Sequence, residues 1–249
     1  LGILASLDRL VPEADRSALQ AWSRALIAPA LRRVGLEPAP DEPARTAALR
    51  AALWAALGTI GADDEIVERS RTLLADGTPS ADLLDAAVRV VAAAGGADVA
   101  EDLRRRATDA STPQDRLRHL GAMADQPGDA EADGFLALCL TDEVRTQDAP
   151  FLLRRVLVNR RQSARAWDVI TERWDEINER FPSNSISRLL EGIRSIVDAD
   201  LADRVDTFLD AHPVPQGERP IAQHRERMRA GVALRARVGD DVAAALRGG

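Results

Sequence analysis

The stretch Thr141–Pro182, which reads TDEVRTQDAPFLLRRVLVNRRQSARAWDVITERWDEINERFP, decides the fold prediction. It begins with a polar turn, continues with the apolar run Phe151–Val158 and, after a polar break, carries large apolar residues at alternating spacings of three and four. This spacing places those residues on one stripe of a helix, while the opposite face is charged. We therefore predict an amphipathic helix whose buried stripe consists of Trp167, Ile170, Trp174, Ile177 and Phe181.

The segments on either side of this stretch also have the pattern of amphipathic helices separated by short polar turns, with no convincing strand. The first predicted helix, Glu13–Val34, has an inward stripe of Leu19, Trp22, Leu26 and Ala30, and Pro29 is expected to kink or divide it. Capping signals predict several helix starts, including Thr78-Pro79 and Thr112-Pro113-Gln114-Asp115. Further helices are predicted at 44–60, 64–75 (stopping at Gly77), 97–107, 130–140, after Ser183 or Ser185, at 201–211 and through Met228.

Helices of this length joined by short turns are what an array of antiparallel helix pairs requires. We predict an all-α fold without significant β structure: an irregular right-handed superhelix of helix pairs, similar to HEAT and armadillo arrays. The array would form one helical-repeat domain over residues 1–249. A compact helical bundle is the competing architecture.

The composition excludes several classes of function. The formal net charge is −7 and all 33 basic residues are Arg, which argues against a nucleic-acid-binding protein and suggests a high-GC bacterial genome. No apolar run is long enough to predict a membrane span. The single cysteine, Cys139, lies in an apolar run and is expected to be a core residue of a protein that works in the cytoplasm.

The residue types that carry catalysis or bind metals do not form a recognisable motif. The three histidines, His119, His212 and His224, lack the spacing of a zinc-binding helix. The pair Gly95-Gly96 is a helix terminus and not a phosphate-binding loop. We therefore predict no catalytic residue, no metal ligand and no cofactor in this chain.

Three parts of the sequence resemble the C-terminal domain of the aminopeptidase N family of zinc metallopeptidases. The upstream part is Arg50–Asp63, matching R-x-x-L-W-x-x-L-x-x-x-G-x-D, and the downstream part runs from Phe208 through Pro213–Pro220 to Gln223–Arg229. Gln162 departs from the glycine common in the family, so it should either avoid positive φ or carry strain. The most specific part is the V-R-x-Q-D turn and the positions after it, matched by Val144, Arg145, Gln147, Asp148, Asn159, Ala166, Trp167 and Trp174.

The resemblance implies the C-terminal domain of a longer bacterial enzyme, which removes N-terminal amino acids from peptides. Leu1 in place of Met likewise suggests that these residues are cut from something longer. The helical domain would enclose the catalytic chamber and gate peptide access without being catalytic itself. Its partners would be the catalytic domain of the same polypeptide, which would hold one zinc ion, and peptide substrates, but neither nucleic acid nor membrane. The alternatives are a free-standing HEAT-like scaffold for protein partners and an all-α enzyme with distant carboxylates.

The resemblance also singles out candidate site residues: Arg145, Gln147, Asp148, Asn159 and Trp167. The turn that carries the first three either packs helices together or faces the catalytic domain. We favour packing, with Asp148 capping the following helix and Arg145 bridging neighbouring helices. The spacing of the tryptophans supports a role in the core. Arginines on a concave face would be an alternative way to hold a peptide carboxylate.

Overall fold

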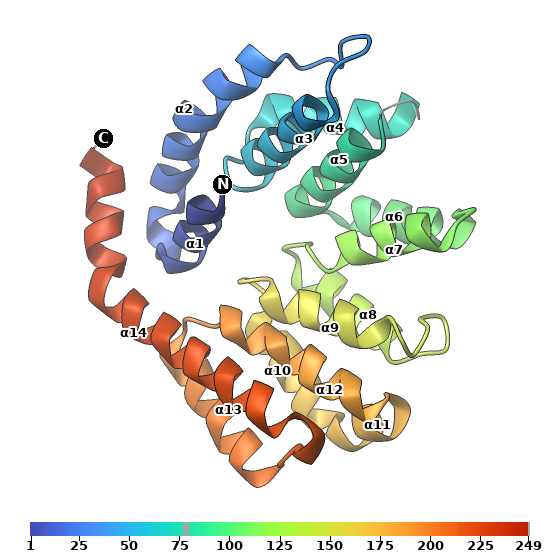
Figure 1. Ribbon diagram of the computed structural model, residues 1–249, viewed down its shortest axis with the longest axis vertical. Coiled ribbons are helices and arrows are strands. Elements are labelled where there is room, and N and C mark those ends of the chain that lie inside the picture. The colour runs from blue at the N-terminus through green and yellow to red at the C-terminus, as the bar shows by residue number, and fades with distance from the viewer. Residues whose placement is uncertain (77–79, 249) are drawn as a thin grey trace. The chain divides into compact units, whose positions relative to one another are not determined.

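The structure is a computed structural model that describes residues 1–76 and 80–248, and it is helical throughout (Figure 1). The described residues form fourteen α-helices and three short 3-10 helices, and they contain no strand. The all-α prediction is therefore confirmed. The predicted stop at Gly77 and the predicted start at Thr78-Pro79 lie outside the described residues.

The chain divides into two compact units, one from Leu1 to Ala122 together with the residues from Val238 onward, and one from Met123 to Arg237. The single domain over residues 1–249 stays a prediction. The first unit holds α1 (Gly2–Leu10), α2 (Arg16–Val34), α3 (Ala44–Thr59), α4 (Asp64–Asp76), α5 (Ala81–Ala94), α6 (Ala97–Asp109) and most of α7 (Pro113–Met123). The second holds α8 (Asp129–Cys139), α9 (Ala149–Val158), α10 (Ser163–Glu172), α11 (Trp174–Arg180), α12 (Ser183–Leu190), α13 (Ala199–Ala211) and the first part of α14 (Glu218–Gly248). The 3-10 helices are Glu13–Asp15, Glu191–Ser195 and Pro215–Gly217.

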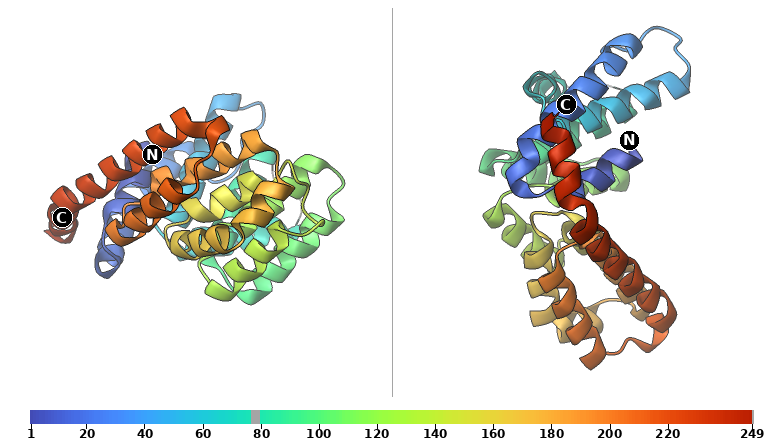
Figure 2. Two further views of the ribbon diagram at one scale, coloured as in Figure 1. Left: turned by 90° about the horizontal axis from the view of Figure 1, so that it is seen from below. Right: turned by 90° about the vertical axis from the view of Figure 1, so that its left-hand side faces the viewer.

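Two pairs of consecutive helices run antiparallel (Figures 1 and 2). Helices α2 and α3 lie side by side and are joined by the loop at residues 35–43 (Figures 1 and 2). Helices α13 and α14 also lie side by side and are joined by residues 212–217 (Figures 1 and 2). Asp206 of α13 accepts hydrogen bonds from Arg225 (2.5 Å) and Arg229 (2.6 Å) of α14. Ion pairs thus link these two helices.

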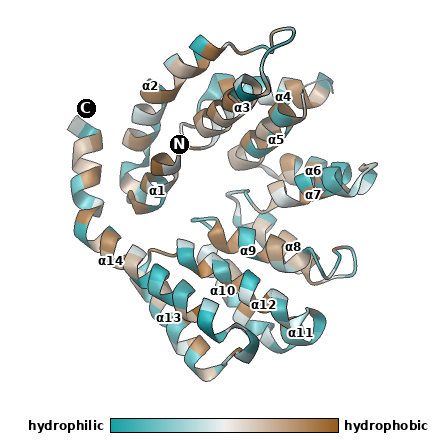
Figure 3. Cartoon of the chain, in the orientation of Figure 1, coloured by the Kyte–Doolittle hydropathy of each residue, from teal (hydrophilic) through white to brown (hydrophobic). Residues whose placement is uncertain are grey.

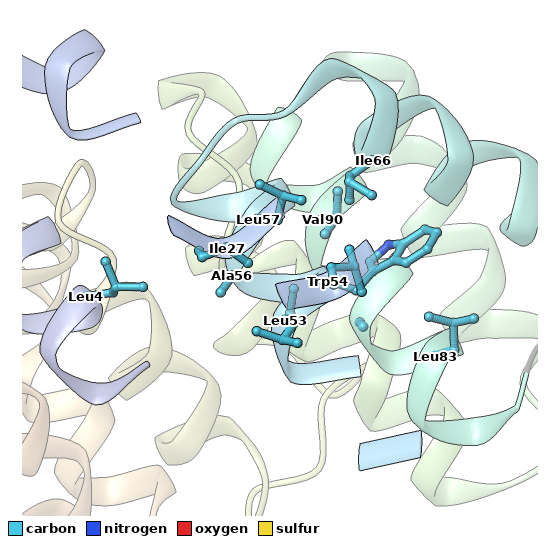
Figure 4. Close-up of a cluster of buried hydrophobic side chains, with 12 residues drawn as sticks. Leu4, Ile27, Leu53, Trp54, Ala56, Leu57, Ile66, Leu83 and Val90 are labelled. Carbon is cyan, nitrogen blue, oxygen red and sulfur yellow. The ribbon is translucent and has the colours of Figure 1, made fainter. Parts of the chain in front are cut away.

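The core of the first unit is built around Trp54 of α3 (Figure 4). This side chain is only 2% exposed, and its indole N–H donates to Ser70 Oγ at 2.9 Å. Gly58, one turn further along α3, allows close packing, because a Cβ there would lie 2.5 Å from a methyl carbon of Val90. Leu49, on the same helix, is 46% exposed.

Arg50 and Asp63 explain the rest of the upstream motif. The buried Arg50 guanidinium donates to Gly35 O (2.8 Å) and to both carboxylate oxygens of Glu42 (2.5 and 2.6 Å), so it closes the loop between α2 and α3. The hydrogen bond between them raises the pKa of Arg50 and lowers that of Glu42. Asp63 Oδ1 accepts from Ile66 N–H (3.1 Å) at the start of α4. All these contacts stabilise the fold.

Helix α2 departs from its predicted packing. Trp22 and Leu26, which were predicted to point inward, are 36% and 54% exposed. The buried stripe lies one position further along, because large apolar residues occur on both faces and spacing alone does not choose between them. The helix is also not divided at Pro29. The buried residues of α2 are Arg16, Leu19, Ser23, Ile27 and Leu31.

Helix α1 was not predicted from the sequence at all; its buried residues are Leu4 and Leu10.

The helix predicted around Trp167 and Trp174 is in fact two helices, α10 and α11. Arg173, with φ −108° and ψ 24°, interrupts the α-helix between them. All five residues of the predicted stripe are nevertheless buried, which confirms that part of the prediction. Both tryptophan rings pack against Phe208 in a T-shaped arrangement, with ring centroids 5.6 and 5.3 Å apart. Hydrophilic and hydrophobic residues alternate along α12 and α13, whereas α11 is mostly hydrophilic (Figure 3).

Candidate functional site

The polar turn before α9 presents its side chains to solvent. Val144 anchors the turn, with 1% of its surface exposed, whereas Arg145 and Gln147 are exposed. Neither of these two side chains forms a hydrogen bond or ion pair with any described residue. The prediction that Arg145 bridges neighbouring helices is therefore wrong. The Arg145 and Gln147 side chains remain available for contact with another domain or molecule.

Asp148 is at the N-cap position of α9, as predicted, but its side chain makes no capping hydrogen bond. Its φ of −96° and ψ of −35° are in the helical region, whereas a capping side chain normally needs an extended backbone at its own residue. The prediction that Asp148 caps the helix is therefore wrong. Pro150 follows in the first turn of α9, where its missing N–H leaves no helical hydrogen bond unmade.

Asn159 is at the other end of α9 and has a structural role. Its side-chain amide donates to Ala124 O (3.1 Å) and to Gln126 O (2.9 Å), and its Oδ1 accepts from Arg161 N–H (3.2 Å). The amide thus satisfies carbonyls that follow the end of α7. Since α9 has ten residues and is about 15 Å long, Asn159 does not form one site with Arg145.

Gln162 replaces the glycine common in the family without backbone strain. Its φ is −114°, and its buried side chain donates to Pro127 O at 2.7 Å and to Asp129 Oδ1 at 3.2 Å. Of the two outcomes expected for a residue other than glycine, avoidance of positive φ is confirmed. Trp167, the last candidate residue, is 1% exposed and packs in the core.

A cavity of about 320 Å³ that sequence reasoning missed opens on the first unit, where α3, α5 and α7 meet. Helix α3 contributes only alanines to it, and the other two helices contribute charged and amide side chains. In the sequence, these charges read as ordinary solvated helix faces, and no local signal marks the cavity. The polar side chains that line it are Asp82, Asp85, Arg89, Gln114 and Arg118.

Two further ionisable groups are buried. His119 is 4% exposed, and its burial lowers its pKa, an effect that Asp115 partly opposes. Burial also raises the pKa of the Cys139 thiol, which has no solvent-exposed surface. The core position predicted for Cys139 is confirmed, and its thiol is a poor nucleophile because little of it is thiolate.

The residues that the structure describes do not fit a metal centre. Over 1–76 and 80–248, no group of three or more His, Cys, Asp or Glu side chains is arranged to hold an ion. In the same part of the chain, no helix is both long and apolar enough to cross a membrane.

Comparison with known proteins identifies the family. Residues 1–230 match the family model of the ERAP1-like C-terminal domain. The chain is 30% identical to Aminopeptidase M1-C of Oryza sativa subsp. japonica over 220 residues, which are 82% of this chain and 24% of the relative. It is 29% identical to Aminopeptidase M1-B of the same plant over 235 residues, covering 88% and 26%, and 30% identical to Aminopeptidase M1 of Arabidopsis thaliana over 207 residues, covering 79% and 23%.

The chain thus spans about a quarter of the length of these relatives. The match to the family model extends across both compact units. Together these similarities confirm the resemblance to the C-terminal domain of aminopeptidase N-like enzymes that the V-R-x-Q-D turn first indicated. The chain belongs to the family of ERAP1-like C-terminal domains.

Proposed function

We propose that this chain is the C-terminal helical domain of a zinc aminopeptidase, in which it encloses the catalytic chamber and gates the access of peptides. The parent enzyme removes N-terminal amino acids from peptides, and this domain performs no bond cleavage. The observation that carries the proposal is the family match over residues 1–230, together with relatives that are aminopeptidases about four times longer than the matched segment.

Two exposed surfaces support a role as one part of a larger enzyme. Arg145 and Gln147 are exposed, and their side chains have no partner among the described residues. On α2, Trp22 and Leu26 are one helical turn apart and more than a third of each is exposed. Apolar side chains in this position lose water contact when another domain packs on them. Both surfaces are candidates for contact with the catalytic domain of the same polypeptide.

The proposed zinc ion belongs to another part of the longer protein. The described residues of this chain do not fit a zinc site, so their contribution is physical. A domain that covers a chamber excludes water and selects substrates by their size. Movement of such a lid also limits the rate at which substrate enters and product leaves.

The first experiment compares this chain with the full-length protein. The chain alone should bind no stoichiometric zinc and should not hydrolyse aminoacyl-naphthylamides, whereas the full-length protein should do both. Zinc-dependent turnover by the purified 249-residue chain would refute the proposal. A reading frame with no zinc-binding helix encoded upstream of Leu1 would instead favour the free-standing scaffold.

The second experiment tests gating through the turn before α9. Arg145→Ala and Gln147→Ala should change the stability of this chain by less than about 0.5 kcal/mol, because both side chains are exposed and unpaired. In the full-length enzyme, the pair should alter the dependence of kcat/KM on peptide length while aminoacyl-naphthylamides are cleaved normally. Arg71→Ala, an exposed change on α4, is the matched control. An unchanged length profile in a folded double variant would exclude gating through this turn.

We further propose that the parent enzyme works in the cytoplasm of a bacterium. The exclusive use of Arg among 33 basic residues supports the bacterial source, and a single buried thiol is compatible with a reducing compartment. Fractionation of the source cells tests this location. Recovery of the enzyme mainly with secreted or membrane material would contradict it.

A further inference from the structure

The cavity on α3, α5 and α7 has an apolar floor. Ala48, Ala51, Ala52 and Ala55 recur at helical spacing, so they share the face of α3 that lines the cavity. Ala55 and Ala86 form its buried base, with 9% and 3% of their surfaces exposed. Larger side chains at these positions would fill the space, so the hollow exists because the residues are alanine.

The other two helices supply both signs of charge. On α5, Asp82, Asp85 and Arg89 follow one another by three and four residues and line the same cavity. They are therefore spread over about 10 Å of the helix axis. Gln114 and Arg118, one turn apart on α7, contribute an amide and a second guanidinium. The lining of the cavity therefore offers both carboxylates and guanidiniums, which suits a ligand that carries both charges.

Several of these groups keep their capacity to bind. Asp82 and Arg89 are exposed and form no ion pair with any described residue. The Arg118 guanidinium donates through Nη1 to Asp115 Oδ1. Its Nε lies 3.6 Å from Asp85 Oδ1, which exceeds a hydrogen-bond distance, and this N–H has no acceptor in the described part of the chain. The polar groups are therefore not all occupied by one another.

We infer that this cavity binds a free α-amino acid with an apolar side chain. Its ammonium group meets Asp82 and Asp85, its carboxylate meets Arg89 and Arg118, and its side chain covers the alanine floor. Charge-assisted hydrogen bonds of this kind are among the stronger polar contacts in proteins. The cavity volume of about 320 Å³ is that of roughly ten water molecules, and this space is large enough to hold one leucine.

The floor favours an amino acid over a peptide. A peptide would place its backbone N–H and C=O groups against alanine side chains, which offer no hydrogen-bond partner, and burying an unpaired amide is costly. A single amino acid has only its two charged groups to satisfy. This inference concerns binding by the chain itself and goes beyond the gating role proposed above.

The test is calorimetric titration of leucine into the 249-residue chain, with saturation-transfer NMR as a second readout. N-acetylleucine, leucinamide and leucylleucine serve as comparison ligands. Leucine should bind. N-acetylleucine lacks the ammonium, leucinamide lacks the carboxylate and leucylleucine is larger, so each of the three should bind at least about tenfold more weakly. No leucine binding at tens of millimolar, or equal binding of a blocked analogue or the dipeptide, would overturn the inference.

Variants locate the site. Arg89→Gln should weaken leucine binding about tenfold, and Ala52→Leu, an exposed change that fills the cavity, should abolish it. The controls Arg71→Gln and Ala236→Leu change exposed helical residues elsewhere and should leave binding unchanged. Circular dichroism confirms that each variant is folded. Full binding by folded Arg89→Gln and Ala52→Leu variants would place any leucine site elsewhere.

Discussion

The hydrogen bond between Trp54 and Ser70 should contribute measurably to the stability of the first unit. The indole N–H is buried and donates to Ser70 Oγ at 2.9 Å, and that hydroxyl in turn donates to Ile66 O at 2.7 Å. Ser70→Ala leaves the indole N–H without an acceptor. An unsatisfied buried donor costs about 1–3 kcal/mol, so we expect this variant to lose about 2 kcal/mol.

Trp54→Phe removes the donor instead. It loses the hydrogen bond, worth about 1 kcal/mol, and leaves a void of roughly 40 Å³, which costs about 1 kcal/mol at ~24 cal/mol per Å³. The hydroxyl of Ser70 keeps its bond to Ile66 O. Ser70→Ala in this background should therefore cost less than about 0.5 kcal/mol, because no donor remains to be left unsatisfied.

The measurement is a double-mutant cycle by urea unfolding, followed by far-ultraviolet circular dichroism so that the signal does not depend on tryptophan. The expected coupling energy between Trp54 and Ser70 is about 1.5 kcal/mol. If Ser70→Ala costs the same in both backgrounds within about 0.3 kcal/mol, the hydrogen bond does not stabilise the unit and the reasoning is refuted.

Three more predictions follow from burial and contacts. Gly58→Ala should lower the free energy of unfolding by about 1–3 kcal/mol, because its Cβ would lie 2.5 Å from Val90. Gly134→Ala on α8, with no atom within 4 Å of its Cβ, should raise the free energy of unfolding by up to about 1 kcal/mol; urea unfolding measures both. Asn159→Ala should cost about 1–3 kcal/mol in the same assay, because two carbonyls lose their donor. His119 has a lowered pKa in the folded state, so below about pH 6.5 the unfolded chain binds a proton at this residue that the folded chain does not. Tm should therefore fall as the pH drops below about 6.5, and the fall should be shallower in His119→Gln.

Each of these predictions has a contradicting outcome. Equal stability changes in the two glycine variants would show that contact with Val90 does not decide the effect. An Asn159→Ala variant as stable as the wild type would mean that water replaces the amide at no cost. His119 should not contribute to any change in Tm above about pH 7, since it is then neutral in both states. An identical pH profile for His119→Gln would exclude this residue as a source of the slope.

Helix periodicity predicted most of the elements because burial repeats with the helical turn. It succeeded where one face is clearly apolar, as at Trp167 and Ile177. It failed on α2, where Trp22 and Leu26 form a second apolar stripe on the exposed face. It also missed the interruption at Arg173, because the apolar spacing continues unchanged across it and only backbone angles reveal it.

The candidate site was less predictable because its chemistry depends on contacts far apart in the chain. Asn159 follows the end of α9, but its partners at Ala124 and Gln126 are more than thirty positions away. Asp148 was a plausible cap from its position, and only its helical backbone angles show that it does not act as one. The cavity requires the faces of three helices to meet, and no single stretch of sequence shows that.

Cys139 provides a built-in reporter of local opening in the second unit. The thiol is the only one in the chain, has no exposed surface and has a raised pKa. A thiol reagent can therefore modify it only after α8 separates from its neighbours. Labelling rates measured at several reagent concentrations would give both the opening rate and the equilibrium population of the open form. The second unit can thus be followed separately from the first without any engineered label.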